Sequence, residues 1–476
     1  MASAHQLNLM KMYMDNEIKR LKNYAEAEKY YRNQTNCSLP SKYEAELQRR
    51  YPRLRANYCR PVIDTMAGRL KVTNVRCEDK KTAAYLQDVW RKNKMDKYSL
   101  KNLKQAIKLG DSFILVWPDD ENKTSKITVL DPATCFPMYA DDDGTMLWFK
   151  RQWVGFDKDG NPAAFKFIYY PDCVERFIYK VSAVQILEKT SLSQLAVANW
   201  EDYTEDELPA SYNHSYGIPF VHFANRADEC PFGESELQDV FGLQDALNIQ
   251  LHILMNVGEF SGFMQGVITG VVKQDFETDE NGDPIIRMTA GDFLTISDTE
   301  ARAYMLPQSS PDGVISVIDE TIDVIAETTL TPRSALEASA GNAITSGYAL
   351  SKAEAPLIRK CEEGQTNFGC SYEEVFSLVI QQARIMGISE VAEIDAYPEW
   401  MPLTDESPTD KLTRAQENAI YVEQKIVSRQ YVQRELGLTQ DEIDKIAEEI
   451  KQEDEAAIDR AIGGMIHGSG ELEDED

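Results

Sequence analysis

Few side chains in this sequence stand at spacings that would support catalysis or metal binding. The 476 residues contain five histidines, and no two of them stand at the spacing of metal ligands. The sequence contains no phosphate-binding GxxxxGK(S/T) loop, no GxGxxG turn, no HExxH helix and no GxSxG elbow. We therefore expect no catalytic residue, no bound metal and no cofactor.

Two acidic turns are the nearest candidates for a calcium site. An EF-hand loop needs Gly at its sixth position and Glu at its twelfth. Counted from Asp157, the sixth position is Pro162, and counted from Asp279 it is Pro284. β-hairpin turns explain both sequences. An acidic metal-dependent hydrolase or nuclease remains an alternative, because the many carboxylates offer many possible pairs.

The charge of the chain is large and unevenly distributed. There are 50 Lys and Arg against 79 Asp and Glu, a net charge of −29. Residues 1–110 carry a net charge of +13, and the remaining 366 carry −42. Such a chain repels free nucleic acid, which disfavours a simple DNA-binding module. Two interpretations stay open: solvated faces, or a subunit whose two ends meet different partners or its own copies.

Cysteine spacing and hydropathy bear on the compartment. The eight cysteines form no CxxC pair and are irregularly spaced, which is typical of reduced thiols in a cytoplasm. The N-terminus lacks the apolar core of a signal peptide. The most apolar stretch, residues 246–272, contains Asn248, His252 and Glu259, so we expect no membrane span.

The first half of the chain predicts helices followed by an antiparallel β meander. We expect helices over residues 5–34 and 41–70, two more within 82–110, and a loop over 199–233. The predicted strands are Phe113–Trp117, Lys126–Leu130, Met146–Val154, Ala164–Tyr170 and Val174–Val181. This order is not a βαβ pattern, so a Rossmann-like enzyme is disfavoured.

Two helices flanking a small β insertion follow. Ser235 and Gln238 form a capping box that predicts a helix start, and apolar spacing carries that helix to about Val257. Residues 265–308 have β character, and a second helix is predicted over Pro311–Thr329. Its carboxylates fall within an arc of about 100°, and apolar residues fill the other sides. In a monomer this is a core helix with one solvated face; in a ring the acidic stripe could face a channel.

The rest of the chain is a flexible loop and more helix. Residues 331–347 are small and flexible in type, which is typical of a functional or disordered loop. Residues 348–386 predict a long helix that Pro356 would kink near its start. Residues 405–476 are helical in pattern and acidic.

Several stretches, in this order and at this spacing, carry a resemblance that extends from about residue 10 to 455. They are Tyr216–Asn225, Phe232–Val240, Gly341–Leu350, Ala355–Leu357, Ile426–Tyr431, Leu436–Leu438 and Asp441–Glu449. Together they resemble the portal proteins of tailed bacteriophages, specifically the portal family of long-tailed, siphovirus-type phages.

The resemblance implies an α+β portal fold in a ring-forming subunit. The implied segments are a wing of N-terminal helices and β meander (1–234), a first stem helix (235–264), a β clip (265–308), a second stem helix (309–330), a tunnel loop (331–347), a long wing helix with its connection (348–400), and a crown with an acidic tail (401–476).

The resemblance also implies a function without catalysis. The ring, commonly of about twelve copies, would occupy one capsid vertex of the virion after assembly in the host cytoplasm. It would conduct double-stranded DNA during packaging and ejection. Its partners would be the terminase large subunit, then the head–tail adaptor, together with the major capsid and scaffolding proteins. Another virion connector or baseplate component is the alternative.

Site residues follow from the same resemblance. The tunnel-loop residues expected near DNA are Arg333, Ser339, Gly341, Asn342, Thr345 and Ser346. The acidic channel lining would be Asp319, Glu320, Asp323 and Glu327. The clip residues expected to dock partners are Asp279, Glu280, Asn281 and Asp283. For Arg333, contact with DNA phosphate and a salt bridge to Glu337 are equally good interpretations.

Overall fold

The fold combines helices and antiparallel sheets in two compact units. A computed structural model describes residues 4–35, 54–140, 144–180, 200–204, 209–227, 231–262, 266–269, 302–305, 310–336, 347–403, 408–435, 443 and 445–452. One unit, here called the body, is Met1–Leu403, and the C-terminal unit is Thr404–Asp476. The mixture of helices and strands confirms the α+β class expected from the sequence.

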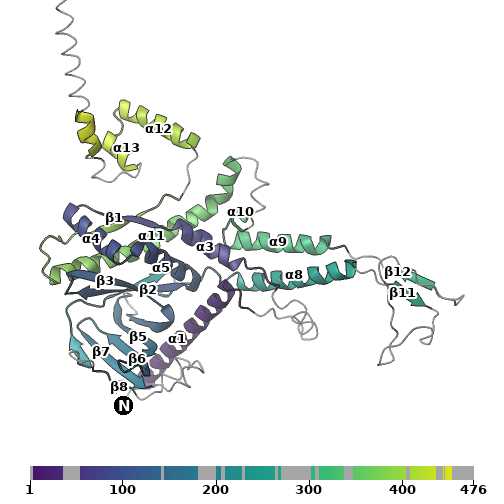
Figure 1. The fold of residues 1–476 in the computed structure, drawn as a ribbon, viewed down its shortest axis with the longest axis horizontal. Helices are drawn as coiled ribbons and strands as arrows, with labels where there is room; N and C mark the ends of the chain where they lie inside the picture. The colour runs from purple at the N-terminus through teal and green to yellow at the C-terminus, as the bar shows by residue number, and fades with distance from the viewer. Residues whose placement is uncertain are drawn as a thin grey trace, which may run out of the picture. The chain divides into compact units, whose positions relative to one another are not determined.

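Most helices of the body lie where the sequence predicts them, among them the long helices α1, α8, α9 and α11 (Figure 1). The described helices are α1 (Ala4–Tyr31), α3 (Cys59–Arg69), α4 (Lys80–Lys92), α5 (Met95–Leu109), α8 (Phe241–Gly262), α9 (Asp312–Thr328), α10 (Arg333–Leu336) and α11 (Gly347–Ile385), with a 3-10 turn at Pro132–Thr134. The helix expected over residues 41–70 is shorter: residues 54–58 have no regular secondary structure, and residues 41–53 lie outside the described part.

The central three-stranded sheet has the order β10-β2-β3 and is antiparallel. Its strands are β2 (Asp111–Asp119), β3 (Thr124–Leu130) and β10 (Phe220–Ala224). The prediction that residues 199–233 form a loop is wrong at β10. Phe220, Val221 and Phe223 are buried there, so tertiary pairing with β2 makes a strand of a stretch that its Gly and Pro neighbours mark as a loop.

The larger sheet confirms only part of the predicted meander. Its strands β5, β6 and β7 follow one another as predicted, whereas β4 was not predicted and the first two predicted strands, β2 and β3, pair with β10 in the central sheet. Strands β4 to β7 are neighbours in chain order, and each pair is antiparallel. β8 and β9 both pair with β7 and were not predicted. The strands are β4 (Cys135–Tyr139), β5 (Met146–Phe156), β6 (Pro162–Tyr169), β7 (Cys173–Lys180), β8 (Glu201–Asp202) and β9 (Ser211–Asn213).

The main core lies between the central sheet and the helices α4, α5 and α11. Tyr372 and Phe376 of α11 are buried against Trp90 of α4 and Phe223 of β10. A separate pair closes the body: β1 (Val72–Cys77) pairs antiparallel with β13 (Ala396–Trp400). The first strand of the body is thereby bonded to its last.

The C-terminal unit is helical where it is described. It contains α12 (Pro408–Glu423), α13 (Arg429–Glu435) and a further helical stretch over residues 445–452. Over the described ranges of the whole chain, no helix is both long and apolar enough to cross a bilayer.

Candidate functional site: the hairpin of α8 and α9

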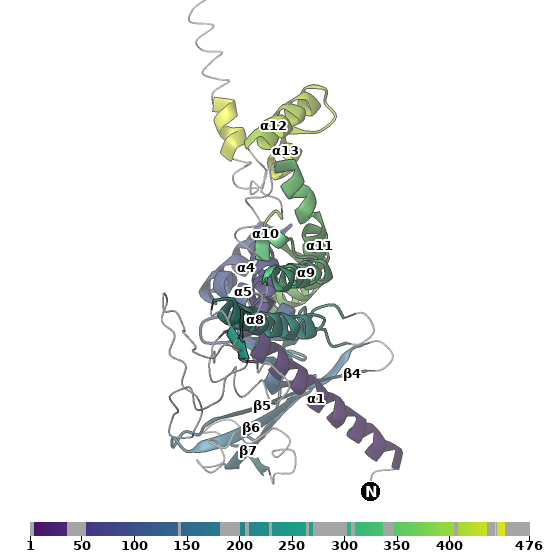
Figure 2. The same cartoon turned by 90° about the vertical axis from the view of Figure 1, so that its right-hand side faces the viewer.

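Helices α8 and α9 pack side by side as an antiparallel pair (Figure 1 and Figure 2). Leu247 of α8 and Ile322 and Ile325 of α9 are buried. The Thr321 hydroxyl donates a hydrogen bond of 3.0 Å to the Gln250 amide oxygen between the helices. The short strands β11 (Gly266–Thr269) and β12 (Arg302–Met305) pair within the segment that joins the helices.

The predicted acidic stripe of α9 is present on its solvent side. Glu320 and Glu327 are exposed, and the side chains of Asp319 and Asp323 are 55% and 46% exposed. Apolar side chains are exposed on the same hairpin. They are Ile253 and Met255 of α8 and Ile315, Val317 and Val324 of α9. The hairpin therefore offers both charged and apolar surface to its surroundings.

Arg333 is bound to this stripe. Its Nη1 lies 2.6 Å from Asp323 Oδ1, and its Nη2 lies 3.0 Å from Asp319 Oδ1. The chain reverses immediately after α9 because Leu330 adopts a left-handed conformation with φ 53°. That reversal, closed by the Thr331 N–H bond of 3.0 Å to the Ala326 carbonyl, brings α10 back beside α9.

Lys360 of α11 bonds to the residues that precede α8 and follow α9, where the hairpin joins the rest of the body. Its Nζ lies 2.5 Å from Glu236 Oε2, just before α8, and donates a 2.8 Å bond to the Thr329 carbonyl at the end of α9. The Lys360 and Glu236 side chains are only 12% and 4% exposed. Asn225 donates a 3.0 Å bond to the other Glu236 oxygen. This buried junction fixes where the hairpin leaves the rest of the body.

The chain enters α8 through a turn held against the end of α5. Ser235 donates a 2.5 Å bond to the Lys108 carbonyl and accepts a 3.1 Å bond from the Leu237 N–H. The prediction that a helix starts at Ser235 is wrong, since residues 236–240 form turns and α8 begins at Phe241. Ser235 does cap backbone, but it caps this turn, whose direction is set by contact with α5.

The same turn depends on a close approach of two glycines. A Cβ on Gly233 would lie 2.3 Å from the Gly110 oxygen and 2.4 Å from the Asn225 nitrogen. Gly110 itself has φ +98°, a conformation that favours glycine. Larger residues at either position would push the hairpin's entry away from α5.

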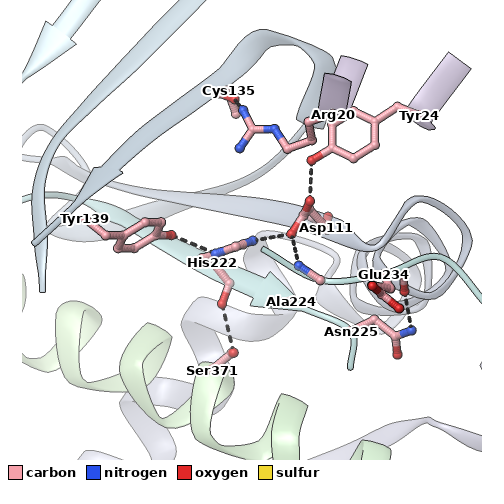
Figure 3. Close-up of polar contacts among 12 residues, drawn as sticks. Arg20, Tyr24, Asp111, Cys135, Tyr139, His222, Ala224, Asn225, Glu234 and Ser371 are labelled. Atoms are coloured by element: carbon pink, nitrogen blue, oxygen red, sulfur yellow. Dashed lines mark hydrogen bonds and ion pairs between the residues drawn. The ribbon is translucent and has the colours of Figure 1, made fainter. Parts of the chain in front are cut away.

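A buried polar network around Asp111 supports this entry (Figure 3). Asp111 accepts hydrogen bonds from the Tyr24 hydroxyl, from His222 Nε2 at 2.7 Å and from the Gly233 N–H at 2.8 Å. His222 Nδ1 shares a 2.7 Å hydrogen bond with the Tyr139 hydroxyl. Burial, followed by the nearby Asp111 carboxylate, raises the pKa of Tyr24 well above its ordinary value.

An Asp–His pair invites comparison with hydrolytic sites. Here the His222 side chain is 9% exposed and Asp111 is 0% exposed, so substrate has no access to the pair. The network links α1, β2, β4, β10 and the turn before α8, and its role is to position them. No local pattern in the sequence marked it, because its members come from distant segments.

Several predicted site residues lie outside the described part of the chain. These are Ser339, Gly341, Asn342, Thr345 and Ser346 of the predicted tunnel loop, Glu337, and Asp279, Glu280, Asn281 and Asp283 of the predicted clip. Within the described ranges, no group of three or more His, Cys, Asp or Glu residues could hold a metal ion.

Comparison with known proteins identifies the family. The family model described as phage portal protein, SPP1 Gp6-like, matches residues 11–456. The chain belongs to this portal protein family. This confirms the resemblance found in its sequence.

The curated relatives of the chain are distant in sequence. The portal proteins of Mycobacterium phages D29 and L5 are each 24% identical to the chain over 333 residues. Each match covers 67% of this chain and 64% (D29) or 63% (L5) of the relative, less than two thirds of its length.

Two solved structures are among those similar to this chain. A chain in the virion of a native gene transfer agent particle has a TM-score of 0.45 and 12% identity, covering 83% of this chain and 93% of that one. A chain in the neck of the native particle, computed with C12 symmetry, has a TM-score of 0.45 and 12% identity over 80% and 90%.

Proposed function

We propose that this chain is the subunit of a portal ring at one vertex of a phage capsid. The ring would conduct double-stranded DNA into the head and out again, and would bind the terminase motor and later a head–tail adaptor. The family match over residues 11–456 carries this proposal. The role is structural and assigns no reaction to the chain. Its place would be the virion, with assembly in the host cytoplasm.

The exposed apolar surface of the hairpin supports ring formation. The side chains of Ile253, Met255, Ile315, Val317 and Val324 are 36–51% exposed in the single chain. Exposed apolar side chains gathered on one hairpin are typical of an interface. A neighbouring copy on either side would cover it, which assigns α8 and α9 to the stem of the ring.

The acidic stripe supports a conduit for DNA. A channel must hold DNA without capturing its phosphates, and carboxylates on the wall prevent capture by repulsion. We assign Asp319, Glu320, Asp323 and Glu327 to that wall. The strands β11 and β12, with the predicted docking residues between them, would belong to the clip. Residues 331–347 would form the tunnel loop, although Arg333–Leu336 within them is the short helix α10 and not the loop expected from the sequence.

A basic face on α5 supports an acidic protein partner. Lys97 and Lys101 of α5 are exposed and stand one turn apart on one side of the helix, and Lys94, directly before the helix, is exposed as well. Among the described residues, no carboxylate is ion-paired with these three lysines, whereas Lys104 pairs with Asp64 at 2.6 Å. We propose that this face meets acidic surface on a neighbouring subunit, the capsid or the scaffold.

The ring is tested with purified full-length protein by native mass spectrometry and negative-stain imaging. We expect a particle of about twelve copies with a central hole. Val317→Asp should shift the mass toward monomers, while the matched change Val154→Asp, at an exposed valine of β5, should leave the ring intact. If both variants form rings of the wild-type mass, the hairpin does not lie in the interface between subunits. A monomer that cleaved DNA would overturn the proposed function.

A further inference from the structure

The four carboxylates on α9 are not equivalent. Asp319 and Asp323 stand one helical turn apart and each binds one arm of the Arg333 guanidinium, at 3.0 and 2.6 Å. Glu320 and Glu327 are exposed, and among the described residues neither is ion-paired with a cation. Half of the stripe is therefore engaged with Arg333, and half is exposed with no ion pair to a cation in the described part of the chain.

Arg333 is the cation best suited to hold DNA in this part of the chain. A guanidinium presents a planar fork of N–H donors that matches phosphate as well as carboxylate. Arg333 stands at the first position of α10, within residues 331–347, the segment predicted to approach DNA. In a ring, every copy would add one such fork to the wall, and each fork that binds a phosphate releases counterions and increases affinity.

The observed geometry occupies that fork. With Nη1 on Asp323 and Nη2 on Asp319, a phosphate could bind Arg333 only by displacing a carboxylate from it. Both carboxylates would also repel the approaching phosphate. The Arg333 side chain is 31% exposed, so it is near the surface but not fully presented to solvent.

We infer that Asp319 and Asp323 act as a shield that withholds Arg333 from DNA phosphates, while Glu320 and Glu327 act only as general negative charge. This inference rests on the proposed function, because it requires DNA to pass the hairpin. It assigns a distinct role to two of the four carboxylates: they prevent a specific grip on the DNA backbone.

The test compares two variants of the full-length ring that remove the same number of charges. Asp319→Asn/Asp323→Asn removes the shield's charge and keeps its shape, and Glu320→Gln/Glu327→Gln is the matched control. Binding of a short DNA duplex is measured over a salt series, after native mass spectrometry has shown that each variant is a ring. A third variant adds Arg333→Gln to the shield variant.

We expect the shield variant to bind DNA about 10-fold more tightly than the control at low salt. Its salt slope should be steeper by about one unit for each Arg333 that reaches a phosphate. Adding Arg333→Gln should return both quantities to the control's level, which a merely structural role of the ion pairs would not produce. If the double variant does not assemble, Asp323→Asn is compared with Glu327→Gln in the same way.

The outcomes separate this inference from the proposed function. If the wild-type chain forms no ring with a central hole, the proposed function itself fails. If rings form and the shield variant binds DNA no more tightly than the control, or if Arg333→Gln does not reverse the gain, the shield is wrong and the portal function stands.

Discussion

Replacing Lys360 tests how firmly the hairpin is joined to the rest of the body. Lys360→Met keeps the length of the side chain and removes its charge. Glu236, only 4% exposed, would then retain a buried charge without its cation, and the Thr329 carbonyl would lose its donor. Removing one partner of a buried ion pair typically costs about 3–5 kcal/mol.

That free energy converts to a measurable shift in melting temperature. Unfolding entropy near the transition is ~2.1 cal/mol/K per residue. For cooperative unfolding of the body, Met1–Leu403, this gives about 0.85 kcal/mol/K, so Lys360→Met should lower Tm by about 4–6 °C. The control is Arg384→Met on the same helix. Arg384 forms an ion pair with Glu393, and their side chains are 46% and 77% exposed. A surface pair contributes about 0–1 kcal/mol, so its Tm should fall by about 1 °C or less.

Calorimetry of the purified variants measures both shifts. The double variant Glu236→Gln/Lys360→Met removes both charges, while Gln can still accept the bond from Asn225, so it should recover at least half of the loss. If Lys360→Met melts at the same temperature as Arg384→Met, or if the double variant melts lower than Lys360→Met, the junction does not stabilise the hairpin as described.

Three further predictions concern the body. Gly233→Ala should prevent soluble folding, because the added Cβ would overlap backbone atoms at 2.3–2.4 Å. At Gly68 an added Cβ would have no atom within 4 Å, so Gly68→Ala should stabilise α3 by about 0.5–1 kcal/mol. Soluble yield and thermal melting compare the two variants. Cys370 is exposed and should be alkylated in the native state well before Cys361, which is buried, as peptide mass spectrometry would show; equal rates would contradict the packing of α11. Burial raises the pKa of Cys59 to about 12 and of Cys361 to about 11, above the ordinary 9.0. Their contribution to stability is therefore complete below pH 9 and is lost as pH rises from 9 through the folded values of 11 to 12. The free energy of unfolding, measured by denaturant titration, should fall over that window by up to about 1.4 kcal/mol per pH unit for each thiol. A free energy of unfolding that is constant from about pH 8 to 11 would show that these thiols are not buried.

The sequence was sufficient for the parts of the fold that local periodicity determines. The long helices α1, α9 and α11 have boundaries close to the predicted ones, and β5, β6 and β7 have their predicted order. The strand β4 was not predicted, and β2 and β3 lie in a separate sheet from the rest of the predicted meander. The strand β10 escaped prediction because its stability comes from β2, far away in sequence. β1 and β13 were missed for the same reason.

The candidate site also has one part that the sequence predicted and another that it did not. The acidic stripe on α9 was predictable, since a helix turns about 100° per residue and the spacing alone gathers the carboxylates. The bond between Arg333 and Asp323 was not, because it depends on the left-handed turn at Leu330. The contact of Lys360 with Glu236 joins segments that share no local pattern, so only the folded chain reveals it.

The pairing of β1 with β13 has a consequence for how the protein is made. About 300 residues separate the two strands, so at ~5–20 residues per second β1 waits about 15–60 s during synthesis for its partner. Both α8 and α9 leave the ribosome within that interval. We expect the nascent chain to expose an unpaired strand edge together with an apolar hairpin, and to need chaperone protection until residue 400 has emerged. A subunit would thus become competent to join others only after its translation is nearly complete.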